Sequence, residues 1–474
     1  MANPYDEVPY ATFPRLKTHP DRLAAVGTLF GMTPAPVTGC RLLEIGCGNG
    51  SNLVPMAYML PGSRFTGIDL AAEPIAEGQR TIDALGLSNI SLEAADLRDL
   101  GPAHGEFDYI VAHGLYSWVP PEVRDALLNA CRRQLAPGGI AFVSYNAYPG
   151  RHFRQMLREM MQYHTRNLQD PAERIRQARW FLEFLLKARL LSPAWRELLE
   201  GEAQALLANG EGALFHDDLA EINQPVYFRD FAQHAARYCL QYLGEADVHE
   251  MFDPQGSLAW LEGDVIEREQ YLDFLRIRRF RQTLLCHEDV ALDREVGPAR
   301  MDRFLFSAPA RVVEGGLIEG LHGIRITAVH EAVNRVTAAL GEVYPLPLAF
   351  EELVPYAGDP EALREILFGL LVGGFADLHV FDFPCADTVT GRPRANLVAR
   401  YQALRSRYVT SACHHTVELD EIGRLLVPLL DGTRTHPEIA QALAALPGGP
   451  AEEAIRQHLG ENLQWLAQVA VLEG

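Results

Sequence analysis

A glycine-rich turn near the start of the chain constrains the fold more than any other stretch. The run Glu44-Ile45-Gly46-Cys47-Gly48-Asn49-Gly50 follows the apolar residues Leu42-Leu43 and precedes Ser51-Asn52-Leu53-Val54. The apolar run suits one buried strand, and the residues after the turn suit the start of a helix. Glycine is needed in such a turn because the chain bends sharply and a ligand contacts bare backbone. The helix start also offers unpaired N–H groups to anionic ligand atoms.

Two acidic residues follow at the ends of the next two predicted strands. Asp69 ends the segment 64–69, and Asp96 follows the segment 90–95. A carboxylate accepts hydrogen bonds from sugar hydroxyls or from an exocyclic amino group. Each acid alone also suits a simpler role as a helix cap. Asp69 alone is also compatible with an NAD(P) site. The NAD(P) motif, however, requires glycine or alanine at the position of Ser51, and it gives no role to Asp96.

The region from Arg41 to Tyr148 alternates predicted strands and helices. We expect helices at 74–86 and 121–136, and strands at 41–45, 64–69, 90–95, 107–112 and 139–145. This order predicts a doubly wound, Rossmann-like α/β domain, in which ligands bind at the carboxyl ends of the strands. The side chains that fall at those ends are Glu44, Asp69, Asp96, His113 and Tyr145.

The loops after the fourth and fifth predicted strands are dense in aromatic and hydrogen-bonding groups. The first carries His113, Tyr116 and Trp118, and the second carries Tyr145 and Tyr148. Aromatic faces attract a sulfonium or an ammonium by cation–π contact. Histidine or tyrosine can orient an amine that must lose a proton before it attacks. We therefore predict that these five residues surround the substrate group that reacts with the bound ligand. His113 would act as a base or contact the cofactor. The alternative is that Trp118 and Tyr148 only pack.

The bulk composition excludes some classes of function. The formal net charge of −20 argues against nucleic-acid or anionic-membrane binding, which needs a basic face. Residues 331–474 hold 10 Lys+Arg against 19 Asp+Glu, so the same holds for that part. The seven cysteines contain no C-x-x-C pair, which indicates a reducing compartment. We see no signal sequence and no apolar run of about 18 residues, and we expect a cytoplasmic protein without membrane insertion.

The pattern E-x-G-x-G-x-G, followed by acids that end the second and third strands, resembles class I S-adenosylmethionine (SAM)-dependent methyltransferases. The resemblance implies that the glycine turn lines the methionine part of SAM, that Asp69 binds the ribose hydroxyls and that Asp96 binds the adenine amino group. The cofactor residues that it implies are Tyr10, Glu44, Gly46, Cys47, Gly48, Asn49, Gly50, Asn52, Asp69, Leu70, Asp96, Leu97 and His113.

Further motifs look like bacterial methyltransferases that carry a methyltransferase regulatory domain, above all the rickettsial-type protein lysine methyltransferases. The motifs are the runs 5–10, 18–20, 113–120, 144–150, 221–228 and 280–287. The resemblance covers nearly the whole chain and implies a protein or peptide lysine as acceptor. One departure concerns the acceptor: the family often has tryptophan after Pro149-Gly150, and here the residue is Arg151.

The resemblance and the helical patterns together suggest four parts. Residues 1–150 form the SAM-binding domain with an N-terminal arm, which either covers the cofactor mouth as a lid or packs outside the sheet. Residues 151–210 form a helical bridge, residues 211–310 a mainly helical regulatory domain, and residues 311–474 a winged-helix-like domain. In the last part, apolar helices at 349–356 and 361–372 precede an alternating segment at 378–383.

The primary hypothesis is therefore a SAM-dependent methyltransferase acting on a protein or peptide lysine amine. Alternatives are a small-molecule N-, O- or C-methyltransferase, a non-catalytic scaffold that binds SAM, and an NAD(P) oxidoreductase. We predict no metal site, because the run Cys413-His414-His415 lacks further ligands at known spacings.

Overall fold

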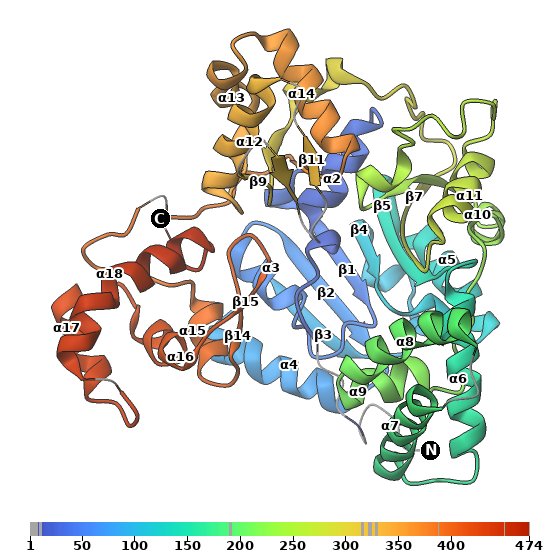
Figure 1. Cartoon of the computed structure of the whole chain (residues 1–474), viewed down its shortest axis with the longest axis horizontal. Helices are drawn as coiled ribbons and strands as arrows, with labels where there is room; N and C mark the ends of the chain where they lie inside the picture. The colour runs from blue at the N-terminus through green and yellow to red at the C-terminus, as the bar shows by residue number, and fades with distance from the viewer. Residues whose placement is uncertain are drawn as a thin grey trace.

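The computed structural model describes residues 8, 12–188, 192–313, 317–320, 325–327, 330–386, 388–449 and 451–473. Its centre is a seven-stranded sheet in the order β3-β2-β1-β4-β5-β7-β6 (Figure 1). The strands are β1 (Arg41–Ile45), β2 (Arg64–Asp69), β3 (Ile90–Ala94), β4 (Phe107–Ala112), β5 (Leu135–Asn146), β6 (Leu240–Glu245) and β7 (Phe280–His287). Strands β1 to β5 pair in parallel, and β7 is antiparallel to both β5 and β6. The predicted Rossmann-like α/β fold is confirmed.

The apolar residues of the strands face two cores on opposite sides of the sheet. Leu42 packs in one core with the helices α2 (Pro20–Leu29), α3 (Leu53–Met59) and α4 (Ala72–Leu85). Its neighbour Leu43 packs in the other core, against α5 (Pro121–Gln134). Successive strand side chains alternate between faces, so a strand buried on both sides is apolar throughout. This arrangement leaves the carboxyl ends of the strands as the edge where polar groups gather.

The predicted regulatory region completes the central sheet. Strands β6 and β7 come from it, together with α10 (Phe228–Ala236) and α11 (Val265–Arg276). The sequence predicted that this region is mainly helical, and the two strands were not predicted. Strand β7 pairs with β5 over 280–285, so the last part of the sheet assembles from segments more than a hundred residues apart. The chain between β5 and α10 forms four helices, α6 (Arg151–Thr165), α7 (Pro171–Lys187), α8 (Pro193–Ala208) and α9 (Glu211–Ala213).

The C-terminal third contains smaller elements. Its first helices are α12 (Glu331–Val343), α13 (Phe350–Ala357) and α14 (Pro360–Val372), and its small strands are β8 (Leu305–Ser307), β9 (Arg311–Val313), β10 (Leu317–Glu319), β11 (Arg325–Thr327), β12 (Leu348–Ala349) and β13 (Asp377–His379). The two helices expected before the alternating segment are therefore present, and β13 pairs with β8. The remaining elements are α15 (Leu397–Ala403), β14 (Tyr408–Thr410), β15 (Thr416–Glu418), α16 (Glu421–Leu426), α17 (His436–Ala444) and α18 (Glu452–Gln468).

Of the last helices, α15 packs against α3 and α4 beside the sheet, and α17 and α18 lie farther out (Figure 1). Tyr58 of α3 donates to Glu473, and the hydroxyl of Thr81 in α4 lies 3.5 Å from that of Tyr401 in α15. Within the described part of the chain, no helix is both long and apolar enough to cross a membrane.

Candidate functional site

The glycine turn adopts the conformation that its sequence predicts. Gly46, Gly48 and Gly50 have φ of 81°, 55° and 72°, a region that residues with a Cβ rarely adopt. The N–H of Gly46 donates to the carbonyl of Ile68, which ties the turn to β2 at 2.8 Å. Gly46 and Gly48 present bare backbone to a cavity, whereas a Cβ on Gly50 would lie 2.9 Å from a methyl carbon of Leu92.

A single cavity of about 1290 Å³ joins most of the predicted cofactor residues. The predicted residues on its wall are Glu44, Gly46, Cys47, Gly48, Asn49, Asn52, Asp69, Leu70, Asp96, Leu97, His113 and Trp118. Gly50 packs against Leu92 and is not part of this wall. Tyr10 lies outside the described residues.

The two strand-end acids lie on the cavity wall, and each also caps local backbone. Asp69 accepts N–H groups from Gly48 and Ala71, both at 2.8 Å. Asp96 accepts the N–H of Arg98 at 2.9 Å and pairs with its guanidinium, which lowers the pKa of the Asp96 carboxyl. A carboxylate has about four acceptor positions. Both acids therefore keep acceptor capacity for a ligand beside their capping role.

Glu44 is the buried acid of the site, and it is only partly satisfied. Its Oε1 accepts from the amide of Asn52 at 2.9 Å. Its Oε2 is buried and has no hydrogen-bond partner among the residues that the structure describes. Burial raises the pKa of Glu44 to about 8. A buried carboxylate oxygen without a partner is costly, so this atom is a position where a ligand cation or donor fits.

His113 follows β4 and is neutral at physiological pH. Burial lowers its pKa to about 3. Its Nδ1 lies 3.3 Å from the hydroxyl of Ser144, which itself accepts the N–H of Gly114 at 2.8 Å. Because the Ser144 oxygen already accepts one hydrogen bond, its own O–H is available for Nδ1, and this favours the Nε2–H tautomer. His113 can orient a partner but is a weak base.

Three tyrosines predicted at the acceptor are not on the cavity wall, and that prediction is corrected. Tyr145 is fully buried, with its hydroxyl 3.0 Å from that of Thr283. It lies on the opposite face of β5 from Ser144 and Asn146, because side chains alternate along a strand. The Tyr116 hydroxyl lies 2.7 Å from Nδ1 of His234.

Tyr148, the third tyrosine, is half-buried and stacks on His152 with ring centroids 4.0 Å apart. Of the five residues predicted around the acceptor, all of which the structure describes, His113 and Trp118 are on the wall.

Other wall residues come from elements that the sequence analysis did not connect to the site. Phe280 and Gln282 of β7 pair opposite Asn146 and Ser144 of β5, and both line the cavity. The run 280–287 does not alternate apolar and polar residues, so the sequence alone did not mark it as a strand, and only the pairing with β5 tells which face it presents. The N-terminal arm, in contrast, was predicted either to cover the cofactor mouth or to pack outside the sheet; its residues 12–17 line the cavity, and Thr12 donates to Asn49 at 2.8 Å.

Arg151, the residue that departs from the family pattern, also lies on the cavity wall. Its guanidinium is 3.8 Å from Asp218, and Arg154 binds the same carboxylate with two hydrogen bonds of 2.9 Å. Burial lowers the pKa of Arg151. The cavity wall therefore carries arginine at the position where the resemblance implied a tryptophan.

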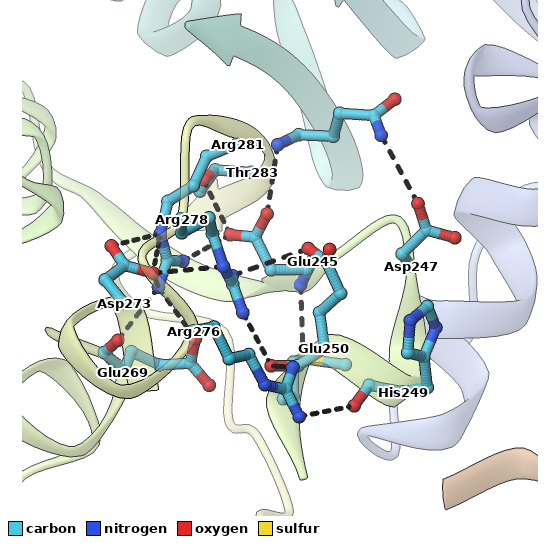
Figure 2. Close-up of polar contacts among 12 residues, drawn as sticks. Glu245, Asp247, His249, Glu250, Glu269, Asp273, Arg276, Arg278, Arg281 and Thr283 are labelled. Atoms are coloured by element: carbon cyan, nitrogen blue, oxygen red, sulfur yellow. Dashed lines mark hydrogen bonds and ion pairs between the residues drawn. The ribbon is translucent and has the colours of Figure 1, made fainter. Parts of the chain in front are cut away.

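A buried ionic network lies directly behind the β7 wall (Figure 2). Arg281 is fully buried and contacts Glu245, Glu269 and Asp273 at 2.6, 3.0 and 2.9 Å. The backbone N–H of Gln282 donates to Glu245 at 3.0 Å, while its side chain faces the cavity. The network joins β6, β7 and α11, and it fixes the strand that supplies the far wall of the site.

The Cys413-His414-His415 run is engaged in other contacts. The sulfur of Cys413 lies 4.0 Å from that of Cys385, and Nε2 of His414 lies 2.9 Å from the amide oxygen of Asn52. Within the described ranges, no group of three or more His, Cys, Asp or Glu side chains is arranged to hold a metal ion.

Three family models match the chain. They are "Methyltransferase domain" over residues 42–139, "Predicted methyltransferase regulatory domain" over residues 210–287 and "PKMT, C-terminal winged helix domain" over residues 391–447. Uncharacterized protein RP789 of Rickettsia prowazekii is 38% identical over 473 residues, which is 93% of this chain and 85% of that protein.

The structure of PKMT2 from Rickettsia typhi matches with a TM-score of 0.85 at 27% identity, covering 98% of this chain and all of that one. Its complex with AdoHcy matches with a TM-score of 0.84. This chain belongs to the rickettsial PKMT-type family of class I methyltransferases. As a PKMT-type methyltransferase it uses SAM as cofactor, so the oxidoreductase and scaffold alternatives no longer apply.

Proposed function

We propose that this PKMT-type methyltransferase transfers the SAM methyl group to a lysine amine of a protein or peptide. The observation that carries the proposal is the full-length likeness to PKMT2. That likeness extends over the regulatory and C-terminal regions as well as over the methyltransferase domain. The size of the cavity adds support, because about 1290 Å³ exceeds the roughly 300–1,000 Å³ of ordinary ligand pockets.

The residues of the cavity fit SAM. The bare backbone of Gly46 and Gly48 suits the methionine part, and the unpartnered oxygen of Glu44 suits its ammonium. Asp69 would hold the ribose hydroxyls and Asp96 the adenine amino group. Bound in this way, SAM supplies an electrophilic methyl group on a sulfonium. The protein contributes alignment and partial exclusion of water at the mouth.

The acceptor side of the cavity suits an amine. Trp118 and Phe280 supply aromatic faces, and Asn146 supplies an amide that can orient N–H groups. A lysine amine must lose a proton before its lone pair attacks, and His113 is too weakly basic to take it at neutral pH. We infer that this proton leaves to solvent and that His113 orients rather than abstracts.

One observation favours a small-molecule acceptor as the second candidate. Arg151 lines the cavity, and its guanidinium lies 3.8 Å from Asp218, so it keeps donors for the carboxylate of a ligand. An acidic metabolite would use this arginine, but so would an acidic residue next to a substrate lysine.

The direct test is label transfer from methyl-labelled SAM. Lysine-containing proteins and peptides, matched arginine-substituted peptides and a panel of small acids are offered to the full-length enzyme. We expect label on lysine-containing polypeptides, with none on the arginine forms. Label that appears only on small acids would replace the proposal with the second candidate.

A further inference from the structure

The chain is poor in lysine, and one of its few lysines is part of the site. Among the 42 lysine and arginine residues, only Lys17 and Lys187 are lysine. Lys17 lines the same cavity as the glycine turn and His113. Lys187, at the end of α7, has a side chain that is 80% exposed and lies 3.7 Å from Glu183. The enzyme thus carries one lysine amine inside its own reaction cavity and one far more exposed lysine amine outside it.

The Lys17 ammonium rests on the cavity wall by ion pairing. Its Nζ contacts the carboxylate of Asp247 and lies 4.0 Å from Asp377. The other oxygen of Asp247 accepts from the amide of Gln282 at 3.3 Å, and Gln282 is itself a wall residue. The Lys17 side chain is 26% exposed, so solvent reaches it.

The backbone around Lys17 is fixed to the cofactor turn. The N–H of Arg15 donates to the side-chain oxygen of Asn52 at 2.8 Å, and the amide of Asn52 donates to the hydroxyl of Thr18 at 2.9 Å. The residues on both sides of Lys17 are therefore bound to the same side chain at the end of the glycine turn. From this fixed base, the flexible four-carbon stem of lysine gives the amine other positions within reach once it leaves Asp247.

We propose that Lys17 is methylated by the enzyme itself, within the same chain. This inference rests on the proposed lysine specificity. The Lys17 ammonium leaves Asp247 and releases a proton to solvent, and the nitrogen lone pair then attacks the methyl carbon of SAM. A nitrogen–carbon bond forms while the carbon–sulfur bond breaks, and its electron pair stays on sulfur as the thioether of S-adenosylhomocysteine. The methylated ammonium can return to Asp247, since methylation keeps the positive charge.

The test incubates the full-length wild-type enzyme with SAM. The Asp69→Asn variant, which is weakened in SAM binding, is expressed in the same way and serves as the unmethylated reference. Peptide mapping by mass spectrometry reads the methyl content of the two lysines separately. We expect methyl groups on Lys17 of the wild type, none on Lys187, and no loss of modification in Lys187→Arg. Lys17→Arg keeps the pair with Asp247 and should remain unmodified. A reaction within one chain also predicts that the modified fraction at a given time does not change when the enzyme is diluted.

A second readout needs no turnover. In cofactor-free enzyme, acetic anhydride labels both amines, and S-adenosylhomocysteine should slow the labelling of Lys17 severalfold while leaving Lys187 unchanged. Equal labelling with and without that ligand would remove Lys17 from the reaction cavity and overturn the inference.

The two proposals fail in different ways. Methylation of a foreign lysine peptide with Lys17 left unmodified would overturn the inference and keep the proposed function. A methyl group that reaches small acids but neither Lys17 nor any peptide would overturn both.

Discussion

The Nε2 atom of His414 lies 2.9 Å from the amide oxygen of Asn52, 362 residues away in the chain. The same oxygen accepts the backbone N–H of Arg15 at 2.8 Å. Because a backbone N–H only donates, the orientation of the amide is fixed and His414 must donate from Nε2. The Asn52 nitrogen donates to Glu44 and Thr18, both at 2.9 Å. The C-terminal region thus helps to hold the buried acid of the cofactor site.

Replacing His414 with alanine should weaken SAM binding about tenfold, the equivalent of one buried hydrogen bond at roughly 1–1.5 kcal/mol. Burial keeps the pKa of His414 far below its ordinary value, so the bond and its effect should persist across neutral and mildly acidic pH. Calorimetric titration with SAM measures the change. His415→Ala is the matched control, since His415 is a half-buried neighbour whose ring packs on Tyr344. Equal SAM affinity in the two variants would refute a role for the contact.

SAM binding should release a proton from Glu44. Burial raises the pKa of Glu44 to about 8, so at pH 7 roughly 90% of the free enzyme carries the proton. A bound cation favours the carboxylate form, which lowers this pKa on binding. Affinity for SAM should therefore rise as pH increases from about 6 to 8 and level off above the pKa of the free enzyme. Binding enthalpies in buffers with different ionisation enthalpies count the protons, and Glu44→Gln should abolish the dependence on buffer.

The residues predicted for the cofactor gather on one cavity more completely than those predicted for the acceptor, for a physical reason. Glu44, Gly48 and Asp69 lie within one βαβ unit, whose local geometry follows from glycine spacing and strand ends. Gln282 reaches the site only because β7 pairs with β5, and no local pattern specifies that pairing.

Tyr145 was predicted at the acceptor and lies on the buried face of β5 instead. A position at a strand end was predicted correctly, but the face on which the side chain falls depends on a one-residue register.

Asp69→Ala should weaken SAM binding by about 2–4 kcal/mol, since it removes charge-assisted hydrogen bonds to the ribose. Part of the loss is structural, because the N–H of Gly48 in the turn loses its acceptor at 2.8 Å. Asp69→Asn retains an acceptor for that N–H and separates the two effects. Glu73→Gln changes an acid on the same cavity wall and serves as the control. Unchanged affinity in Asp69→Ala by calorimetry would contradict the cofactor assignment.

The rate of methyl transfer to a lysine peptide should rise with pH between about 6 and 9, because the fraction of neutral lysine amine rises there. His113, with a pKa of about 3, does not titrate in this range. His113→Gln should therefore lower kcat without moving the profile along the pH axis. A rate that depends on a group titrating near pH 6.5, and loses that dependence in His113→Gln, would instead identify His113 as the base.

Replacing Arg281 with methionine should destabilise the protein and disturb the β7 wall. The change leaves Glu245, Glu269 and Asp273 buried without their shared cation (Figure 2), and breaking a buried ion pair typically costs about 3–5 kcal/mol. Asp273 keeps Arg278 at 3.1 Å. Burial already raises the pKa of Glu269 and Asp273, so carboxyls that lose Arg281 should take up protons more readily, and the loss of stability should be smaller at lower pH. Urea unfolding at two pH values measures both effects.

Arg229→Met removes an exposed arginine at the start of α10 and should cost less than about 0.5 kcal/mol, because surface pairs contribute little. A midpoint for Arg281→Met that matches this control would mean that the three carboxylates find other partners, and the network would then not be what holds β7 in place.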